Sequence, residues 1–258
     1  MLAPAWSVAQ PKQDKALHIE PQAAQVLKHM TEYLQGLQQF SIQAEIAEDV
    51  LLDSGLKIQD GRSVTASVRR PNRLRVDSLG DQGDRQLFYD GKTITLMDLS
   101  NNVYSTIDVP PEIDAALNHT IKVYNLRAPL ADLLYANAYD SLMEGTLAGF
   151  YLGLSKVQGQ LCHHLAFRQK EIDWQIWIEN GPTPLPRKFL ITDKKARGLQ
   201  VTALLSQWNT SPQLEDSLFM FVVPATAEKV TLRPVAAPVR AKKTKKCSRG
   251  CSHADDEA

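Results

Sequence analysis

Apolar and polar residues alternate along stretch after stretch of this chain, and no helical pattern separates the early stretches from one another. In the first of them, Phe40, Ile42 and Ala44 alternate with Ser41 and Gln43. A period of two predicts strands with one dry and one wet face. Consecutive strands without crossover helices are joined by hairpins, so their pairing is antiparallel. These stretches cover residues 40–47, 64–68, 73–77, 86–89, 92–97 and 103–109.

Turn residues support the same interpretation. Asp90-Gly91 separates two alternating stretches, and an Asp-Gly pair in that position is typical of a tight hairpin. The segment 180–186 is too rich in proline to continue a ladder and is predicted to be a loop. After residue 145 the alternation resumes, and it predicts strands over residues 149–156, 160–169, 173–179, 187–192, 199–207 and 218–222.

Helical periodicity is confined to two regions. Residues 21–39 begin with Pro21 and carry an apolar stripe at the i, i+3, i+4 spacing of an amphipathic helix. Residues 111–125, 129–135 and 138–144 are short apolar segments, predicted to cover the sheet as lids. The predicted fold class is therefore α+β: one large, curved antiparallel sheet of about eleven strands, an unclosed half-barrel, with a helical lid. The alternation defines two faces of this sheet and does not distinguish the concave one.

The length of the chain fits one large β-rich domain. We predict this domain over residues 21–230, an arm over residues 1–20 and a disordered tail over residues 231–258. The tail is basic, with four lysines within residues 242–246, and it lacks apolar periodicity. The whole chain carries 29 basic and 29 acidic side chains, a balance that weighs against a nucleic-acid partner. No run reaches the ~18–20 apolar residues of a membrane-spanning helix.

The arm resembles the end of a secretory signal peptide without its beginning. Ser7 and Ala9 place small side chains at the two positions that a signal peptidase reads, for a cleavage after Ala9. The basic segment and apolar run that normally come first are missing. Two alternatives remain: a start upstream of Met1 with export to the periplasm, or a cytosolic protein with an alanine-rich arm. We favour the first.

The sequence predicts no enzyme, cofactor or metal site. It contains no Gly-x-Ser-x-Gly, Gly-rich phosphate loop or His-Glu-x-x-His. His163 and His164 are adjacent in a predicted strand and point to opposite faces, so they do not hold one metal together. Asp173 has the chemistry of a general base, but an exposed strand carboxylate is the favoured interpretation. In the tail, Cys247, Cys251 and His253 fall one ligand short of a tetrahedral zinc site.

A broad curved sheet with few covering helices has difficulty filling its concave face with its own side chains. Such a face suits an acyl chain, because burying each CH2 contributes ~0.8 kcal/mol. The aromatic residues of the later strands are core in the favoured interpretation and a cavity wall in the alternative. The candidate ligand-binding residues are Ile42, Ile46, Val64, Val68, Leu74, Val76, Ile94 and Leu96, with Phe167, Trp174 and Ile176 opposite, and Leu117, Ile121, Leu133 and Leu134 as the helical lids.

Several segments together resemble a known family. They are Tyr89-Asp-Gly-Lys-Thr-Ile-Thr95, Val103-Tyr104, Pro129-Leu-Ala-Asp-Leu-Leu134, Cys162-His-His-Leu-Ala-Phe-Arg-Gln169, Asp173-Trp-Gln-Ile-Trp-Ile-Glu179, Pro184-Leu-Pro-Arg-Lys188 and Trp208-Asn209. They resemble the predicted periplasmic proteins of domain of unknown function 2092, which are similar in fold to the lipoprotein carrier LolA and the lipoprotein LppX. The resemblance runs from about Val26 to Val223. It implies an unclosed barrel of antiparallel strands, helices that plug its mouth, a hydrophobic cavity and export to the periplasm. It implies no catalytic residue.

The leading hypothesis is a periplasmic, non-enzymatic binding or carrier protein for a fatty acyl, lipid or lipoprotein ligand in a hydrophobic cavity. The alternative is an envelope protein–protein interaction or sensor module, which would use the open sheet edge or the proline-rich loop. A hydrolase with a dispersed site is the least favoured. The lysines of the tail could contact anionic lipid, although a solvated and dispensable extension is the favoured interpretation.

Overall fold

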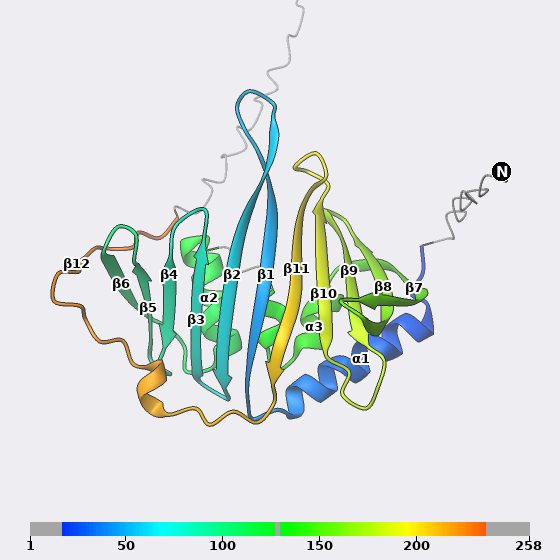
Figure 1. The fold of residues 1–258 in the computed structure, drawn as a ribbon, viewed down its shortest axis with the longest axis horizontal. Coiled ribbons are helices and arrows are strands. Elements are labelled where there is room, and N and C mark those ends of the chain that lie inside the picture. Colours follow the sequence, from blue (N-terminus) through cyan, green and yellow to red (C-terminus); the bar gives the residue numbers. More distant parts are fainter. Residues whose placement is uncertain (1–16, 127–129, 236–258) are drawn as a thin grey trace, which may run out of the picture.

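The computed structural model describes residues 17–126 and 130–235, which form one twelve-stranded sheet with helices on one face (Figure 1). The two peptidase positions Ser7 and Ala9, and the tail residues Cys247, Cys251 and His253, lie outside the described residues. The strand order is β12-β6-β5-β4-β3-β2-β1-β11-β10-β9-β8-β7, and the two end strands do not pair with each other. The sheet is therefore unclosed, as predicted.

Most strands fall where the alternation predicts them, and they are generally longer. Each sheet neighbour pairs antiparallel except β12, which pairs parallel with β6. The bounds are β1 Gln39–Leu51, β2 Lys57–Arg69, β3 Arg73–Gly80, β4 Arg85–Tyr89, β5 Thr93–Asp98, β6 Val103–Asp108, β7 Thr146–Val157, β8 Gln160–Gln169, β9 Ile172–Glu179, β10 Pro186–Asp193, β11 Leu199–Asn209 and β12 Glu228–Lys229.

The helices share one face of the sheet, here called the inner face; the opposite one is the outer face (Figure 1). They are α1 Pro21–Gly36, α2 Ile113–Tyr124, the 3-10 helix η1 Ala131–Leu134 and α3 Ala138–Met143. The long helix begins at Pro21, as predicted, because its missing N–H is not needed in the first turn. The segment predicted as a helix over residues 129–135 is the single 3-10 turn η1.

Two apolar cores form between the helices and the inner face. The first packs Leu27, Met30 and Leu34 of α1 onto β8, β9 and β10, where Trp174 stacks between Phe167 and Phe189 at ring-centroid distances of 4.2 and 5.5 Å. The second packs Ile113, Ala116 and Leu117 of α2 onto β2 to β6. The helices thus cover the two sides of the sheet with separate cores.

The predicted strand over residues 218–222 is wrong. Residues 216–219 form the 3-10 helix η2, Asp216–Phe219, and the chain then crosses the strands to reach β12 at the far edge (Figure 1). Phe219 is fully buried, and Phe221 lies 5.3 Å from the Phe88 ring on the outer face. The sequence of residues 218–222 alternates because the rings of Phe219 and Phe221 anchor this segment, here called the strap, to the sheet. The backbone of the strap does not pair with a strand.

Phe219 fastens this strap, together with the ion pair between Arg69 and Asp216. Replacing Phe219 with alanine should lower the free energy of unfolding by about 3 kcal/mol, because it leaves a cavity in a fully buried site. Met220 provides a control, since it is 60% exposed and Met220→Ala should change the free energy by less than about 0.5 kcal/mol. Urea denaturation measures both. Equal effects of the two variants would contradict this role of Phe219.

Candidate functional site

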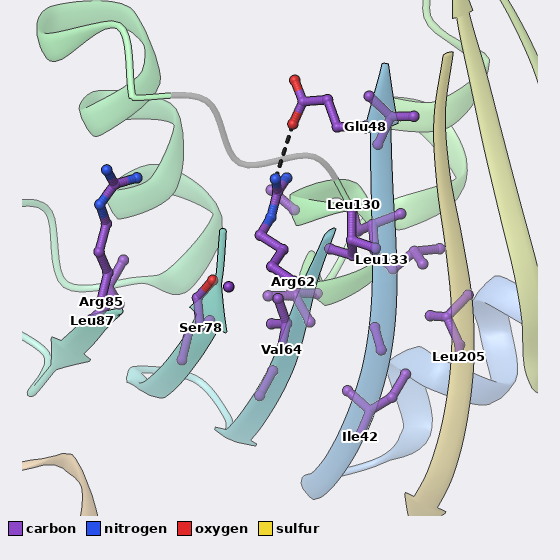
Figure 2. A pocket seen from close by; sticks show the side chains of 18 of the residues that line it. Ile42, Glu48, Arg62, Val64, Ser78, Arg85, Leu87, Leu130, Leu133 and Leu205 are labelled. Atoms are coloured by element: carbon purple, nitrogen blue, oxygen red, sulfur yellow. Dashed lines mark hydrogen bonds and ion pairs between the residues drawn. The ribbon is translucent and has the colours of Figure 1, made fainter. Parts of the chain in front are cut away.

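A cavity of about 770 Å³ lies between the inner face and the segments α2 and η1 (Figure 2). Its walls come from β1, β2, β3, β4 and β11, that is, from the middle of the sheet between the two cores. The apolar lining consists of Ile42, Ala44, Ile46, Val64, Ala66, Leu74, Val76, Leu87, Leu117, Ile121, Leu130, Ala131, Leu133, Leu134, Val201, Leu205 and Trp208. The remaining lining is polar or glycine: Glu48, Asp60, Gly61, Arg62, Ser78, Gly80, Gln82, Gly83 and Arg85.

Strand register sorts these residues by polarity along the strands. The deepest row across β1 to β4 is apolar throughout: Ile42, Ala66, Val76 and Leu87. One row nearer the β1–β2 hairpin, the inward residues are Ala44, Val64, Ser78 and Arg85. The next rows hold Ile46, Arg62 and Gly80, and then Glu48 and Asp60. The cavity therefore has an apolar floor and a charged mouth.

Side chains at the mouth hold one another by hydrogen bonds. Arg62 Nη1 donates to Glu48 Oε2 at 2.9 Å, and their side chains are only 24% and 30% exposed (Figure 2). Arg85 Nη2 donates to the Gln82 carbonyl at 3.1 Å, and Gln82 Nε2 donates to Asp60 Oδ2 at 2.6 Å. In the part of the chain that the structure describes, no carboxylate lies within ion-pair distance of Arg85, although Asp98, its direct cross-strand partner on β5, interacts electrostatically with its charge.

Gly80 allows β2 and β3 to approach closely at this mouth. A Cβ atom there would lie 2.4 Å from the Gly61 carbonyl oxygen and 2.4 Å from Arg62 Cβ. Real Cβ atoms do not come so near to backbone, so a side chain at Gly80 would push the strands apart or displace Arg62.

The roof segment η1 is tied to α2 by polar contacts. The Ala136 N–H donates to the Asp114 carboxylate, with 3.0 Å to each oxygen, and Tyr135 OH donates to Asn118 Oδ1 at 3.3 Å. Arg70 Nη2 donates to the Tyr135 carbonyl at 3.3 Å. Burial raises the pKa of Tyr135 to about 12, and burial also lowers the pKa of Arg70.

The candidate residues either line the cavity or are packed only in the two cores, and the lining residues Ile42, Ile46, Leu74 and Leu117 belong to a core as well. The lining includes Ile42, Ile46, Val64, Leu74, Val76, Leu117, Ile121, Leu133 and Leu134. The other candidates are packed in protein: Val68, Ile94 and Leu96 lie in the core under α2, and Phe167, Trp174 and Ile176 lie in the core under α1. Among the aromatic residues of the later strands, Phe167, Trp174 and Phe189 belong to the core under α1, Trp177 is buried in a separate small cluster with Val157 and Cys162, and Trp208 lines the cavity.

Sequence reasoning missed the polar mouth, although a signal was present. Arg62 and Asp60 continue the inward series of Val64 and Ala66 at the same period of two. Trp208 carried no such signal. The inward series of β11 runs through Ala203 and Leu205, and Gln207 should come next. The register shifts opposite Ser41 and Gln43, and Gln207 adopts φ 47°, so Trp208 takes the inward position instead.

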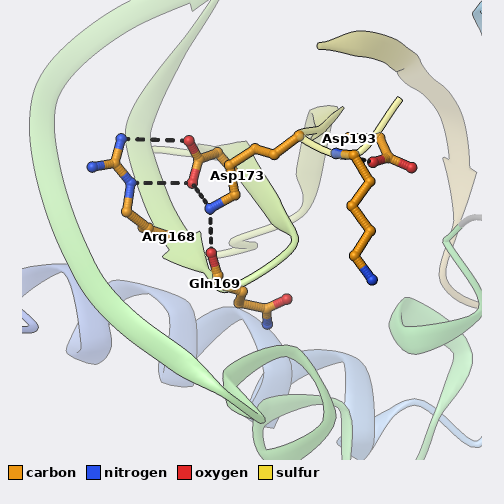
Figure 3. Close-up of polar contacts among 6 residues, drawn as sticks. Arg168, Gln169, Asp173 and Asp193 are labelled. Atoms are coloured by element: carbon orange, nitrogen blue, oxygen red, sulfur yellow. Dashed lines mark hydrogen bonds and ion pairs between the residues drawn. The ribbon is translucent and has the colours of Figure 1, made fainter. Parts of the chain in front are cut away.

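The residues considered for catalysis are engaged elsewhere. His163 Nδ1 lies 2.9 Å from Tyr151 OH, whereas the His164 ring stacks on Trp177 of the neighbouring strand β9. The rings of His163 and His164 therefore occupy opposite faces of the sheet. Asp173 accepts hydrogen bonds from Arg168 at 3.2 and 3.4 Å and from Lys194 at 3.2 Å (Figure 3).

Within residues 17–126 and 130–235, no group of three or more His, Cys, Asp and Glu side chains is arranged to hold a metal ion. Over the same ranges, no helix has both the length and the apolar character needed to cross a membrane.

Residues 23–233 match the model of a family described as "Predicted periplasmic protein (DUF2092)". A comparison with curated proteins found no match. Among solved structures, an uncharacterized conserved protein from Thermus thermophilus is 13% identical with a TM-score of 0.48, over 81% of this chain and 99% of that one. The lipoprotein LppX of Mycobacterium tuberculosis is 13% identical with a TM-score of 0.48, over 76% of this chain and 100% of that one. MucB of Pseudomonas aeruginosa, in its complex with MucA, is 18% identical with a TM-score of 0.41, over 76% of this chain and 60% of that one. These structural matches are too distant to transfer a ligand or a partner.

The pKa of Tyr135 gives a prediction for alkaline solution. Because the folded state holds this pKa at about 12, above the usual value near 10, the unfolded chain releases the proton first as the pH rises. The free energy of unfolding should therefore fall between about pH 10 and pH 12. Tyr135→Phe should reduce this fall, leaving the part due to Tyr89, whose pKa is also raised to about 12. Urea denaturation across this range, compared with pH 7, measures the difference. Identical pH profiles for the two proteins would contradict the prediction.

Proposed function

The chain belongs to the DUF2092 family of predicted periplasmic proteins, and from that premise we propose that it is a non-enzymatic protein that binds or carries a lipid-like or lipoprotein acyl ligand. Its family assigns it to the periplasm. The observation that supports the proposal best is the cavity under α2 and η1, whose floor is made of branched aliphatic side chains. A ligand whose apolar part packs against this floor is bound by burial of apolar surface alone, and the protein needs no reacting group.

Size and chemistry both favour a hydrocarbon chain in this place. A volume of about 770 Å³ falls within the ~300–1,000 Å³ of sites that enclose small molecules. Each buried CH2 contributes ~0.8 kcal/mol. Burial of a medium-length hydrocarbon chain therefore outweighs the free energy lost when that chain is ordered in the cavity. We propose contacts from Ile42, Val64, Leu74 and Val76 below the ligand. Above it the contacts come from the lid residues Leu117, Ile121, Leu133 and Leu134.

Native mass spectrometry of the full chain, purified from its own host, tests this proposal. We expect an excess mass that denaturation releases as an extractable lipid or acyl compound. A clean unliganded mass, together with no rise in melting temperature on adding fatty acids or lipopeptides, would overturn the proposal, because a ligand that binds only the folded state must raise that temperature.

A substitution that fills the cavity should abolish binding and leave the fold intact. Val64 lines the floor, and Val64→Trp would occupy the space proposed for the chain. Thr65 is exposed on the outer face of the same strand, so Thr65→Trp is a matched control. The uncharged fluorescent probe phenylnaphthylamine should bind the wild type and Thr65→Trp, with at least about tenfold weaker binding to Val64→Trp. Equal binding to all three would place the probe outside the cavity.

A second function is favoured by the free edge of the sheet. At β7 the side chains of Leu147, Leu152 and Leu154 are 48%, 38% and 51% exposed. The open edge of this strand is occupied at Gly149, which exchanges backbone hydrogen bonds with His18 and Glu20, and at Tyr151, whose N–H donates to Glu20 Oε2 at 2.9 Å. Among the described residues, no backbone partner pairs with this edge beyond Tyr151. An extended peptide could add to such an edge. The proline-rich loop is less suited to this role, because Leu185 is buried and Trp208 Nε1 donates to the Pro186 carbonyl at 3.0 Å.

Leu154→Lys tests the edge. If the protein is an interaction module, one stoichiometric envelope partner should copurify with the wild type, survive delipidation and be lost from Leu154→Lys. A partner that this variant retains would place the contact elsewhere on the molecule.

A further inference from the structure

We infer that the cavity selects amphiphiles with an anionic head, a carboxylate or phosphate oxyanion that Arg62 and Arg85 bind at the mouth. The inference rests on the proposed function, because the chain of the same molecule would occupy the apolar floor. It adds a charge requirement and an orientation: the chain lies toward Ile42 and Leu74, and the head lies toward the β1–β2 hairpin.

The two arginines face one site from different strands. Arg62 comes from β2 and Arg85 from β4, and Ser78 of β3 lies between them on the same inner face (Figure 2). Ser78 is the direct cross-strand partner of Arg85, and Gly80 is that of Arg62. Because Gly80 has no side chain, no group of β3 stands in front of Arg62. The site thus offers two guanidinium groups and one hydroxyl.

Arginine is well suited to this task. Its planar fork carries five N–H donors and binds both oxygens of a carboxylate or phosphate at once. Arg85 uses one donor nitrogen, Nη2, for the Gln82 carbonyl at 3.1 Å; its cross-strand partner Asp98 interacts with its charge but is not within ion-pair distance of it. Arg62 uses Nη1 for Glu48. Both guanidinium groups therefore keep donors for an oxyanion.

Position along the strands fixes the orientation of the ligand. Arg62 lies one row nearer the β1–β2 hairpin than Arg85. The row below Arg85 on β1 to β4 is wholly apolar, so an anionic head placed there would lose its water without gaining a partner. At the mouth, the same head stays close to solvent and gains charge-assisted hydrogen bonds. An uncharged head gains less in either place.

Glu48 is the internal competitor for Arg62. Its carboxylate now occupies Nη1 at 2.9 Å, in a pair whose two side chains are mostly buried. An incoming oxyanion must displace this carboxylate or share the guanidinium with it. Removing the charge of Glu48 should therefore tighten binding of an anionic amphiphile, whereas removing that of Arg62 should weaken it.

Isothermal titration calorimetry of the full chain tests these expectations with dodecanoate, dodecyl phosphate and dodecanol, which share one chain and differ in the head. The wild type should bind at least one of the two anions at least about tenfold more tightly than the alcohol, the difference expected for a charge-assisted hydrogen bond. Arg62→Gln and Arg85→Gln should each remove most of that preference by weakening the binding of the anion. Glu48→Gln should increase it.

Arg168→Gln is the matched control. Arg168 loses the same charge but lies on β8, where it pairs with Asp173 outside the cavity (Figure 3). Its variant should bind all three compounds as the wild type does. Arg85 is exposed, so its variant is expected to fold normally even if loss of the buried Arg62–Glu48 pair destabilises the other two.

The outcomes separate this inference from the proposed function. Equal affinity for dodecanoate, dodecyl phosphate and dodecanol would overturn the charge requirement and leave a hydrophobic carrier. An anion preference that survives both Arg62→Gln and Arg85→Gln would overturn the assignment of the arginines. Binding of none of the compounds would remove the proposed function and this inference together. A preference for one anion over the other identifies the head as carboxylate or phosphate.

Discussion

Pairing between β1 and β11 joins the two halves of the sheet. The strands β1 to β6 pair with their neighbours in sequence, and so do β7 to β11, so each half is built from local hairpins. Only the β1–β11 ladder, with Ile46 opposite Ala203, links the halves across more than 150 residues. Closing so long a loop costs entropy that local hairpins do not face. Most of the cavity wall comes from β1 to β4, and Val201, Leu205 and Trp208 of β11 complete it, so the wall is whole only when both halves are paired.

The location of the cavity follows from where the helices pack. On one side α1 covers the aromatic residues of β8 to β10, and on the other α2 covers the aliphatic residues of β2 to β6. Between them the sheet is covered by η1, a single turn held by Asp114 and Arg70. A single turn fills less space than a helix of several turns. The middle of the sheet is therefore the part that the chain's own atoms leave open.

Local alternation was sufficient to predict the strands, because the period of two depends only on neighbouring residues. It failed at residues 218–222, where Phe219 and Phe221 alternate like a strand but anchor a strap. It also did not distinguish Val64, which lines the cavity, from Val68, which is buried under α2, since both face inward on β2. That difference depends on where a distant helix lies. The alternation could have predicted that the charged residues Arg62 and Asp60 face inward. It could not have predicted the bulge that turns Trp208 inward.

The size of the inward-facing side chains also distinguishes the cavity from the two cores. Around the open space, the small inward residues Ala44, Ala66, Ser78 and Gly80 lie among larger aliphatic ones such as Ile42 and Leu87. On either side, the inward positions of the same sheet carry Phe40 and Tyr89, or Phe167 and Trp174, and these regions are packed. Larger side chains at Ala44 and Ala66 would have filled the space and gained the burial that the two cores obtain. A chain that instead places small residues and a charged rim there gives up stability at one place, which is typical of a site kept open for a ligand.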